Sequence, residues 1–268
     1  MEQIKNITLY HGDCLEVMPT LADGGVDMIL VDLPYEVLNK RNQHSQWDKE
    51  IDIDALWAQW KRVIKPNGAI VLFGQGLFSA KLMLSNPKMY RYSLVWDKCR
   101  VTGFLNVARM PLRCHEDILV FYQSLPTYNP QMQDLNGREK NHSNGREKNH
   151  SRQHCFSEVN RCYGNFKRIP TQILDKKFPQ SIISIPKEHI NGKYYHPTQK
   201  PVALMEYLIR TYTNEGDCVL DCACGSGSTL VGCLNTNRRG IGIELTEEYY
   251  NIALGRVRQA CAQLKMDL

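Results

Sequence analysis

The sequence lacks any hydrophobic run long enough to cross a membrane. The longest apolar runs, such as residues 69–73, are far shorter than the ~20 residues that a membrane-spanning helix needs. The first residues, Met-Glu-Gln-Ile-Lys, also lack the apolar stretch of a signal peptide. These absences argue against a transmembrane protein and lead us to expect a cytoplasmic one, in a bacterial or phage-infected cell.

Disulfides and metal sites are also not expected. A chain of 268 residues can bury about 70–75% of its unfolded surface and needs no disulfides to hold its core. The ten cysteines are therefore interpreted as reduced thiols. Cys155 and Cys162, with His154 beside them, lack the spacing of a zinc site, so we expect no metal.

The net positive charge is confined to one segment. The chain carries a net charge of +5, while residues 130–195 hold twelve basic and six acidic residues, so the rest of the chain carries −1. A basic segment on a near-neutral body favours contacts with phosphate groups, although a solvated loop is the alternative. The segment contains a tandem duplication of NGREKNHS, at 136–143 and 144–151, which has no apolar side chain and predicts a polar, mobile loop.

On either side of this segment the sequence alternates between strand and helix patterns. Strands are expected at residues 26–31, 69–73, 117–122, 218–221 and 240–244, and helices at 54–63, from Pro201 onward and at 228–234. This alternation predicts an α/β fold with a mostly parallel sheet covered on both faces. Residues 1–129 and 196–268 then form its two halves, and residues 130–195 are an insert.

A glycine turn follows the strand at residues 218–221. Gly225 and Gly227 open the next helix, and Glu244 ends the following strand, 17 residues after Gly227. Such a turn lets a ligand approach the backbone, and the carboxylate accepts hydrogen bonds from ribose hydroxyls. Glycines that serve packing alone are the alternative. Because the turn departs from GxGxxG, with Leu230 at the last position, it favours a nucleoside cofactor other than a dinucleotide.

A second motif, Asp32-Leu33-Pro34-Tyr35, ends the strand at residues 26–31. The exocyclic amine of a base is a poor nucleophile because its lone pair is delocalised into the ring. If the Asp32 carboxylate and the Leu33 carbonyl each accept one amino hydrogen, the lone pair can turn toward an electrophile. Pro34 fixes the local backbone, and Tyr35 offers a face on which the base can stack.

Together these motifs resemble the S-adenosylmethionine-dependent amino-methyltransferases of DNA, in the permuted group whose catalytic motif precedes the cofactor motif. The matching stretches are LYHGDCLEVM (9–18), VDLPY (31–35), HPTQKP (196–201), VLDCACGSGST (219–229) and GIGIEL (240–245). The resemblance implies a Rossmann-like fold with circularly permuted motif order. It also implies that residues 130–195 are the target-recognition region.

The same resemblance implies the roles of individual residues. Asp221, Gly225 and Gly227 would shape the methionine end of the cofactor site. Glu244 would bind the ribose, Asp13 would lie near the adenine of the cofactor, and Lys200 would face its carboxylate. The complete implied cofactor site is Asp13, Lys200, Asp221, Cys222, Ala223, Gly225, Gly227, Ser228, Thr229, Glu244 and Leu245.

Two positions depart from the pattern of the family. Ala223 replaces an aromatic residue that is common two positions before the first motif glycine, so the wall of the cofactor pocket is built differently. Glu36 replaces the glycine that commonly follows the catalytic tyrosine, so residues 36–47 approach the base in their own way.

The reaction implied is methyl transfer to adenine N6 in duplex DNA, with the base flipped out of the helix. Asp32 would orient the amine rather than act as a strong base. Methylation at cytosine C5 needs a cysteine nucleophile, usually after proline, and none of the twelve prolines precedes a cysteine. Cytosine N4 uses the same amine chemistry and remains the alternative, although Asp32, rather than a serine, favours adenine by resemblance.

Two other classes of protein explain less of the sequence. An NAD-dependent oxidoreductase would use the glycine turn and Glu244 but would leave residues 32–35 without a role. A non-catalytic DNA-binding module would explain only the basic segment. A restriction-modification role fits the resemblance, whereas the recognition sequence, a cognate endonuclease and a homodimer cannot be derived from the sequence.

Overall fold

The computed structural model describes residues 1–34, 51–134, 176–187 and 199–266, and the short strands at 159–160, 164–165 and 172–173. Tyr35, both NGREKNHS copies, and Cys155 and Cys162 lie outside the described residues. The chain divides into two compact units. One contains Met1–Asn129 and Ser181–Leu268, and the other contains Pro130–Gln180.

The larger unit is built around a sheet of nine strands among the described residues. Its strands are β1 (Glu2–Ile4), β2 (Ile7–His11), β3 (Val26–Val31), β4 (Ile64–Gly74), β5 (Tyr90–Thr102), β6 (Arg113–Phe121), β12 (Ile182–Ser184), β13 (Cys218–Asp221) and β14 (Arg239–Glu244). In space they follow the order β1-β2-β14-β13-β3-β4-β6-β5-β12. The five neighbours from β2 to β4 are all parallel. Strands β1, β6 and β5 pair antiparallel, and β12 is parallel to β5. The mostly parallel α/β sheet expected from the sequence is confirmed.

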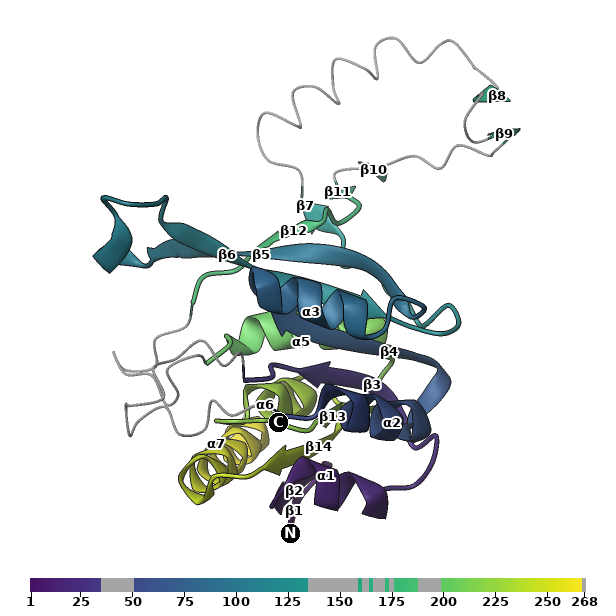
Figure 1. The fold of residues 1–268 in the computed structure, drawn as a ribbon. Helices are drawn as coiled ribbons and strands as arrows, with labels where there is room; N and C mark the ends of the chain where they lie inside the picture. Colours follow the sequence, from purple (N-terminus) through teal and green to yellow (C-terminus); the bar gives the residue numbers. More distant parts are fainter. Residues whose placement is uncertain are drawn as a thin grey trace. The chain divides into compact units, whose positions relative to one another are not determined.

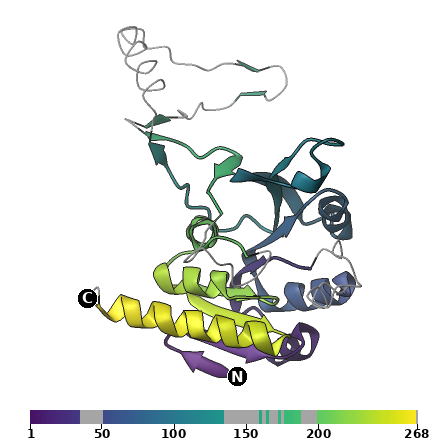
Figure 2. The ribbon, with the colours of Figure 1, turned by 90° about the vertical axis from the view of Figure 1, so that its left-hand side faces the viewer.

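Helices cover both faces of this sheet (Figures 1 and 2). They are α1 (Cys14–Val17), α2 (Ile53–Val63), α3 (Leu77–Ser85), α5 (Val202–Tyr212), α6 (Ser228–Asn235) and α7 (Glu247–Met266), with short 3-10 turns η1 (Met18–Thr20) and η3 (Phe104–Asn106). Leu208, Leu230 and Val257 of α5, α6 and α7 belong to one buried cluster. Trp60 of α2 and Leu82 of α3 belong to a second. The sheet therefore lies between two apolar layers.

Local signals in the sequence explain where α2 begins and which face it buries. The Asp52 carboxylate accepts hydrogen bonds from the backbone amides of Asp54 and Ala55, both at 3.0 Å, which is the usual stabilisation of a helix start. Leu56, Trp57, Trp60 and Val63 recur at helical spacing and are all buried. The chain then passes directly into β4 at Ile64, five residues earlier than the expected strand at 69–73.

The order of the strands reverses between β3 and β13. From β3 the chain continues through α2 to β4 on one side, and from β13 it continues through α6 to β14 on the other. The two strands are parallel, with Val219 opposite Met28 and Leu220 opposite Ile29. Their carboxyl ends therefore lie side by side at the point where open α/β sheets bind ligands.

The smaller unit holds only short strands among the described residues. Strands β7 (Gln133–Asp134), β11 (Lys176–Lys177) and β10 (Gln172–Ile173) form one antiparallel sheet. Strands β8 (Val159–Asn160) and β9 (Gly164–Asn165) form another. The expected insert of residues 130–195 extends beyond this unit, because Ile182–Ser184 form a strand of the large sheet beside β5.

No helix in the described parts of the chain is long and apolar enough to span a membrane. Within the same residues, no group of three or more His, Cys, Asp or Glu side chains could hold a metal ion.

The close approach of α6 to α7 yields a stability prediction. Gly227, at the start of α6, has φ +78°, and a Cβ there would lie 2.9 Å from Cβ of Ala253 on α7. Gly216 has a similar φ of +83° but open space around its Cβ position. Both alanine variants carry the left-handed backbone strain, so Gly227→Ala should lower the free energy of unfolding by about 1–3 kcal/mol more than Gly216→Ala. Urea unfolding measures the difference, and equal losses would contradict the contact.

Candidate active site at the strand-order reversal

The predicted catalytic motif lies at the carboxyl end of β3. Asp32, Leu33 and Pro34 directly follow this strand; Leu33 is buried, Pro34 is half-buried, and the Asp32 side chain is 22% exposed. Tyr35 is outside the described residues. Because β13 is the parallel neighbour of β3, Asp32 lies beside the glycine turn that follows Asp221. The structure thus brings together two motifs that are 189 residues apart in the sequence.

Lys200 joins the Asp32 carboxylate from the segment before α5. Its ammonium forms an ion pair with Asp32 Oδ2, lies 3.2 Å from Glu116 Oε2 and sits 5.0 Å from the ring centroid of Phe73. Burial acts to lower the pKa of Lys200, but the two carboxylates outweigh it and raise this pKa above its ordinary value. Lys200 is therefore protonated, and its charge favours the ionised form of Asp32. The contact pairs Lys200 with Asp32 of the predicted catalytic motif. The role that the resemblance implied for Lys200, at the cofactor carboxylate, stays a prediction.

The glycine turn is held by the carboxylate of Glu244. Backbone amides of Gly225 and Thr246 donate to its two oxygens, each at 2.9 Å. Burial raises the pKa of Glu244 even though these hydrogen bonds act in the opposite direction. Gly225 has φ +51°, and no atom lies within 4 Å of its Cβ position. The backbone of the turn is therefore open to a ligand on that side, and Glu244 stands at its base.

The buried side chain of Asp221 makes hydrogen bonds at the start of the same turn. Its carboxylate accepts hydrogen bonds from the Thr229 hydroxyl at 2.5 Å and the Ala223 amide at 3.2 Å. Burial of this carboxylate raises its pKa to about 7, against the effect of these hydrogen bonds, and the charges of Asp32 and Glu244 add to the shift. Asp221 is consequently a group whose protonation changes near neutral pH.

The remaining predicted cofactor residues surround the ends of β13 and β14. Asp13 caps α1 by accepting a hydrogen bond from the Leu15 amide at 2.8 Å, and the preceding Gly12 amide donates to the Glu244 carbonyl at 3.0 Å. Leu245 is 60% exposed beside Glu244. Three further residues lie in or next to the turn: Cys222 and Ser228 are buried, and Ala223 is half-buried.

Two residues that contact the predicted site residues carry no motif in the sequence. Arg256 of α7 donates to the Ser226 carbonyl at 2.6 Å and to the hydroxyls of Ser226 and Ser228 at 3.0 and 3.2 Å. Glu116 of β6 contacts Lys200. Neither residue has a local pattern that could reveal its role, because each reaches the site only through the packing of a distant element.

Comparison with known proteins supports this arrangement. Residues 26–255 match the N6/N4-methyltransferase family, described as DNA methylase. The chain belongs to this family of DNA methylases. The resemblance to S-adenosylmethionine-dependent amino-methyltransferases of DNA is thereby confirmed.

Individual relatives cover nearly the whole chain. The type II methyltransferase M.HpaI of Haemophilus parainfluenzae is 27% identical over 256 residues, which are 93% of this chain and 73% of the relative. The DNA adenine methyltransferase YhdJ of Escherichia coli strain K12 is 26% identical over 261 residues, covering 93% of this chain and 82% of the relative.

Solved structures of other methyltransferases share the fold. The M1.HpyAVI–SAM complex is 24% identical and superposes with a TM-score of 0.61, covering 94% of this chain and 98% of the other. The cytosine-N4-specific PvuII DNA methyltransferase is 15% identical and superposes with a TM-score of 0.67, covering 95% of this chain and 87% of the other. At these identities the likeness establishes a Rossmann-like methyltransferase fold and nothing finer.

The raised pKa of Asp221 predicts how stability depends on pH. The unfolded chain ionises this group near its ordinary pKa of 3.8, whereas the folded chain retains the proton until about pH 7. Stability from this group is therefore fully present below pH 4 and is lost as the pH rises through 7. Asp221→Asn removes the titration, so the free energy of unfolding of the variant relative to wild type should rise by up to about 4 kcal/mol between pH 4 and pH 8. Urea unfolding at both pH values tests this, and a constant difference would contradict it.

Proposed function

We propose that this protein methylates N6 of adenine at a specific sequence in duplex DNA, with S-adenosylmethionine as methyl donor. One observation carries the proposal: Asp32 follows β3 directly beside the glycine turn that follows β13. A ligand held at the turn and a base held at Asp32 would therefore meet at the same edge of the sheet.

The residues present fit S-adenosylmethionine. Gly225 offers open backbone, and Glu244 supplies a carboxylate at the end of the next strand, where ribose hydroxyls would bind. Asp221 and Gly227 would shape the methionine end, and Asp13 would lie near the adenine. When bound, the cofactor supplies an electrophilic methyl group.

Asp32 prepares the amine rather than removing its proton in advance. The carboxylate would accept one amino hydrogen and the Leu33 carbonyl the other, which frees the nitrogen lone pair from the ring. The Lys200 ion pair supports this role, because it holds Asp32 in the ionised form that can only accept hydrogen bonds. Tyr35 remains the predicted stacking surface for a flipped base, and flipping would require a few kcal/mol that stacking offsets.

The choice of adenine rests on two observations. Asp32 stands where serine would favour cytosine N4, and a relative of similar length, YhdJ, is named a DNA adenine methyltransferase. Cytosine N4 is the second candidate, since the PvuII enzyme of the same fold is cytosine-N4-specific.

We also propose that residues 130–195 contact the target sequence and that the protein acts in the bacterial cytoplasm as part of a restriction-modification system.

Removing Asp32 should separate catalysis from cofactor binding. DNA from cells expressing the wild-type protein should carry N6-methyladenine at one motif, and DNA from cells expressing Asp32→Ala or Asp32→Asn should not. Affinity for S-adenosylmethionine should change by less than about tenfold, or 1.4 kcal/mol, because Asp32 contacts the base.

Modification-sensitive sequencing and calorimetry measure the two effects. Asp54→Ala, an exposed aspartate on α2, is the control and should keep wild-type methylation. An Asp32 variant that retains a tenth of wild-type turnover would refute the role of this carboxylate, and N4-methylcytosine in place of N6-methyladenine would select the second candidate.

Replacing Glu244 should weaken the binding of S-adenosylmethionine. Glu244→Ala should weaken S-adenosylmethionine binding by about 1–3 kcal/mol, through the loss of charge-assisted hydrogen bonds. Because Glu244 also holds the amides of Gly225 and Thr246, Glu244→Gln, which retains one carbonyl acceptor, should bind more tightly than the alanine variant. Unchanged affinity in both variants by calorimetry would show that the turn serves another purpose.

A further inference from the structure

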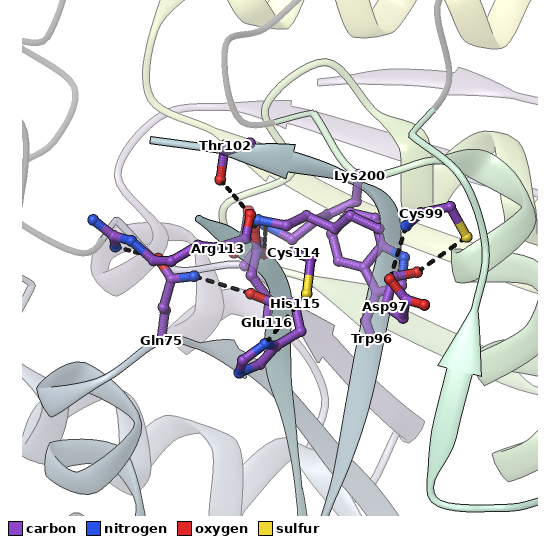
Figure 3. A network of polar contacts seen from close by, with 12 residues as sticks. Gln75, Trp96, Asp97, Cys99, Thr102, Arg113, Cys114, His115, Glu116 and Lys200 are labelled. Atoms are coloured by element: carbon purple, nitrogen blue, oxygen red, sulfur yellow. Dashed lines mark hydrogen bonds and ion pairs between the residues drawn. The ribbon is translucent and has the colours of Figure 1, made fainter. Parts of the chain in front are cut away.

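A second, half-buried carboxylate contacts Lys200 and is not part of the predicted catalytic motif. Glu116, near the start of β6, has a side chain that is 12% exposed. Its Oε2 lies 3.2 Å from the Lys200 ammonium (Figure 3). Its Oε1 lies 3.2 Å from the ammonium of Lys98 on β5. The four groups alternate in sign as Asp32, Lys200, Glu116 and Lys98.

Burial makes this alternation necessary. Side chains of Lys200 and Lys98 are only 6% and 3% exposed, and a buried ammonium without a counter-charge is strongly unfavourable. Two carboxylates and two ammonium groups cancel in net charge. Burial alone would raise the pKa of Glu116, but Lys200 and Lys98 hold it below its ordinary value. Glu116 is therefore ionised and supplies the charge that both lysines share.

Two more charged groups interact with these four side chains. Lys187, which follows β12, is half-buried; burial, with the charges of Lys98 and Lys200, lowers its pKa, while Glu116 and Asp32 act in the opposite direction. The charge of Asp32 also acts on Asp221 and raises the pKa of that carboxyl. Lys200 thus stands between carboxylates on β6 and after β3, with other cations nearby, and its position depends on both carboxylates.

We propose that Glu116 is a positioning residue for methyl transfer: it anchors Lys200 so that the ammonium holds the Asp32 carboxylate in place and ionised, and Lys98 balances the charge of Glu116. The inference rests on the proposed function and adds to it residues of β5 and β6. Glu116 acts only through Lys200, so its effect should appear in the rate of methyl transfer and in the titration of Lys200 rather than in cofactor affinity.

Glu116→Gln is the central test. It removes one of two carboxylates that raise the pKa of Lys200 while leaving burial in place. We expect the single-turnover rate at neutral pH to fall at least tenfold, and the KM for S-adenosylmethionine to change less than threefold. An alkaline limb should also appear in the pH–rate profile about 1–3 pH units below that of the wild type, as Lys200 loses its proton. Glu206→Gln is the matched control, because it breaks the Glu206–Arg210 pair on α5 and should leave rate and profile unchanged.

The double variant Lys98→Met/Glu116→Gln distinguishes charge balance from damage to the fold. Removing both members takes away the Lys98 charge that Glu116→Gln leaves without its carboxylate, so the alkaline limb should move back toward higher pH than in Glu116→Gln alone. If Glu116 were merely structural, the double variant would be as impaired or more so. Thermal unfolding of every variant identifies any that fail to fold.

Side-chain NMR of Lys200 in the protein without DNA reports its protonation independently of activity. A lower titration midpoint of Lys200 in Glu116→Gln is expected, and an unchanged midpoint together with an unchanged rate would overturn the proposal. Wild-type protein that methylates no DNA would instead refute the proposed function, while the NMR titration would still test whether Glu116 controls Lys200.

Discussion

The parallel pairing of β3 with β13 is the constraint on which the site depends. Val219 lies opposite Met28 and Leu220 opposite Ile29, in the interior of the sheet. This register brings Asp32 and Asp221 to neighbouring strand ends. The chain continues from these two strands toward opposite sides of the sheet, and open α/β sheets bind ligands at such a reversal. A slip of one residue would turn the side chains of the shifted strand to the opposite face of the sheet.

Carboxylates at this edge serve the local fold as well as the proposed chemistry. Glu244 holds the Gly225 and Thr246 amides, and Asp221 holds Thr229 and the Ala223 amide. Asp32 differs, because its counter-charge comes from Lys200, which is anchored in turn by Glu116. The same low-dielectric surroundings that make these contacts strong also make any unpaired member destabilising. Electrostatic balance therefore links β5 and β6 to the end of β3.

Much of the sheet and its helices could be predicted from the sequence. The strands at 26–31 and 218–221 and the helix at 228–234 were expected, and the structure has them at Val26–Val31, Cys218–Asp221 and Ser228–Asn235. In these three elements, apolar runs bounded by turn residues were sufficient to predict where the element lies. Strand β12 was missed because a three-residue strand at the edge of a sheet has no periodicity of its own, and its place depends on pairing with β5. The roles of the predicted site residues and of the insert at 130–195 stay predictions.

By itself the sequence determined the family, the α/β class and the two motifs, because each motif is a short stretch whose chemistry is carried by adjacent residues. Only the tertiary structure decided that Lys200 contacts Asp32, and that Glu116, Lys98 and Arg256 support the site. Those residues come from separate elements, and no local pattern predicts which side chains will face each other across a sheet edge. Burial decides the outcome: once Lys200 is removed from water its charge must be matched, and the fold supplies Asp32 and Glu116 as the partners.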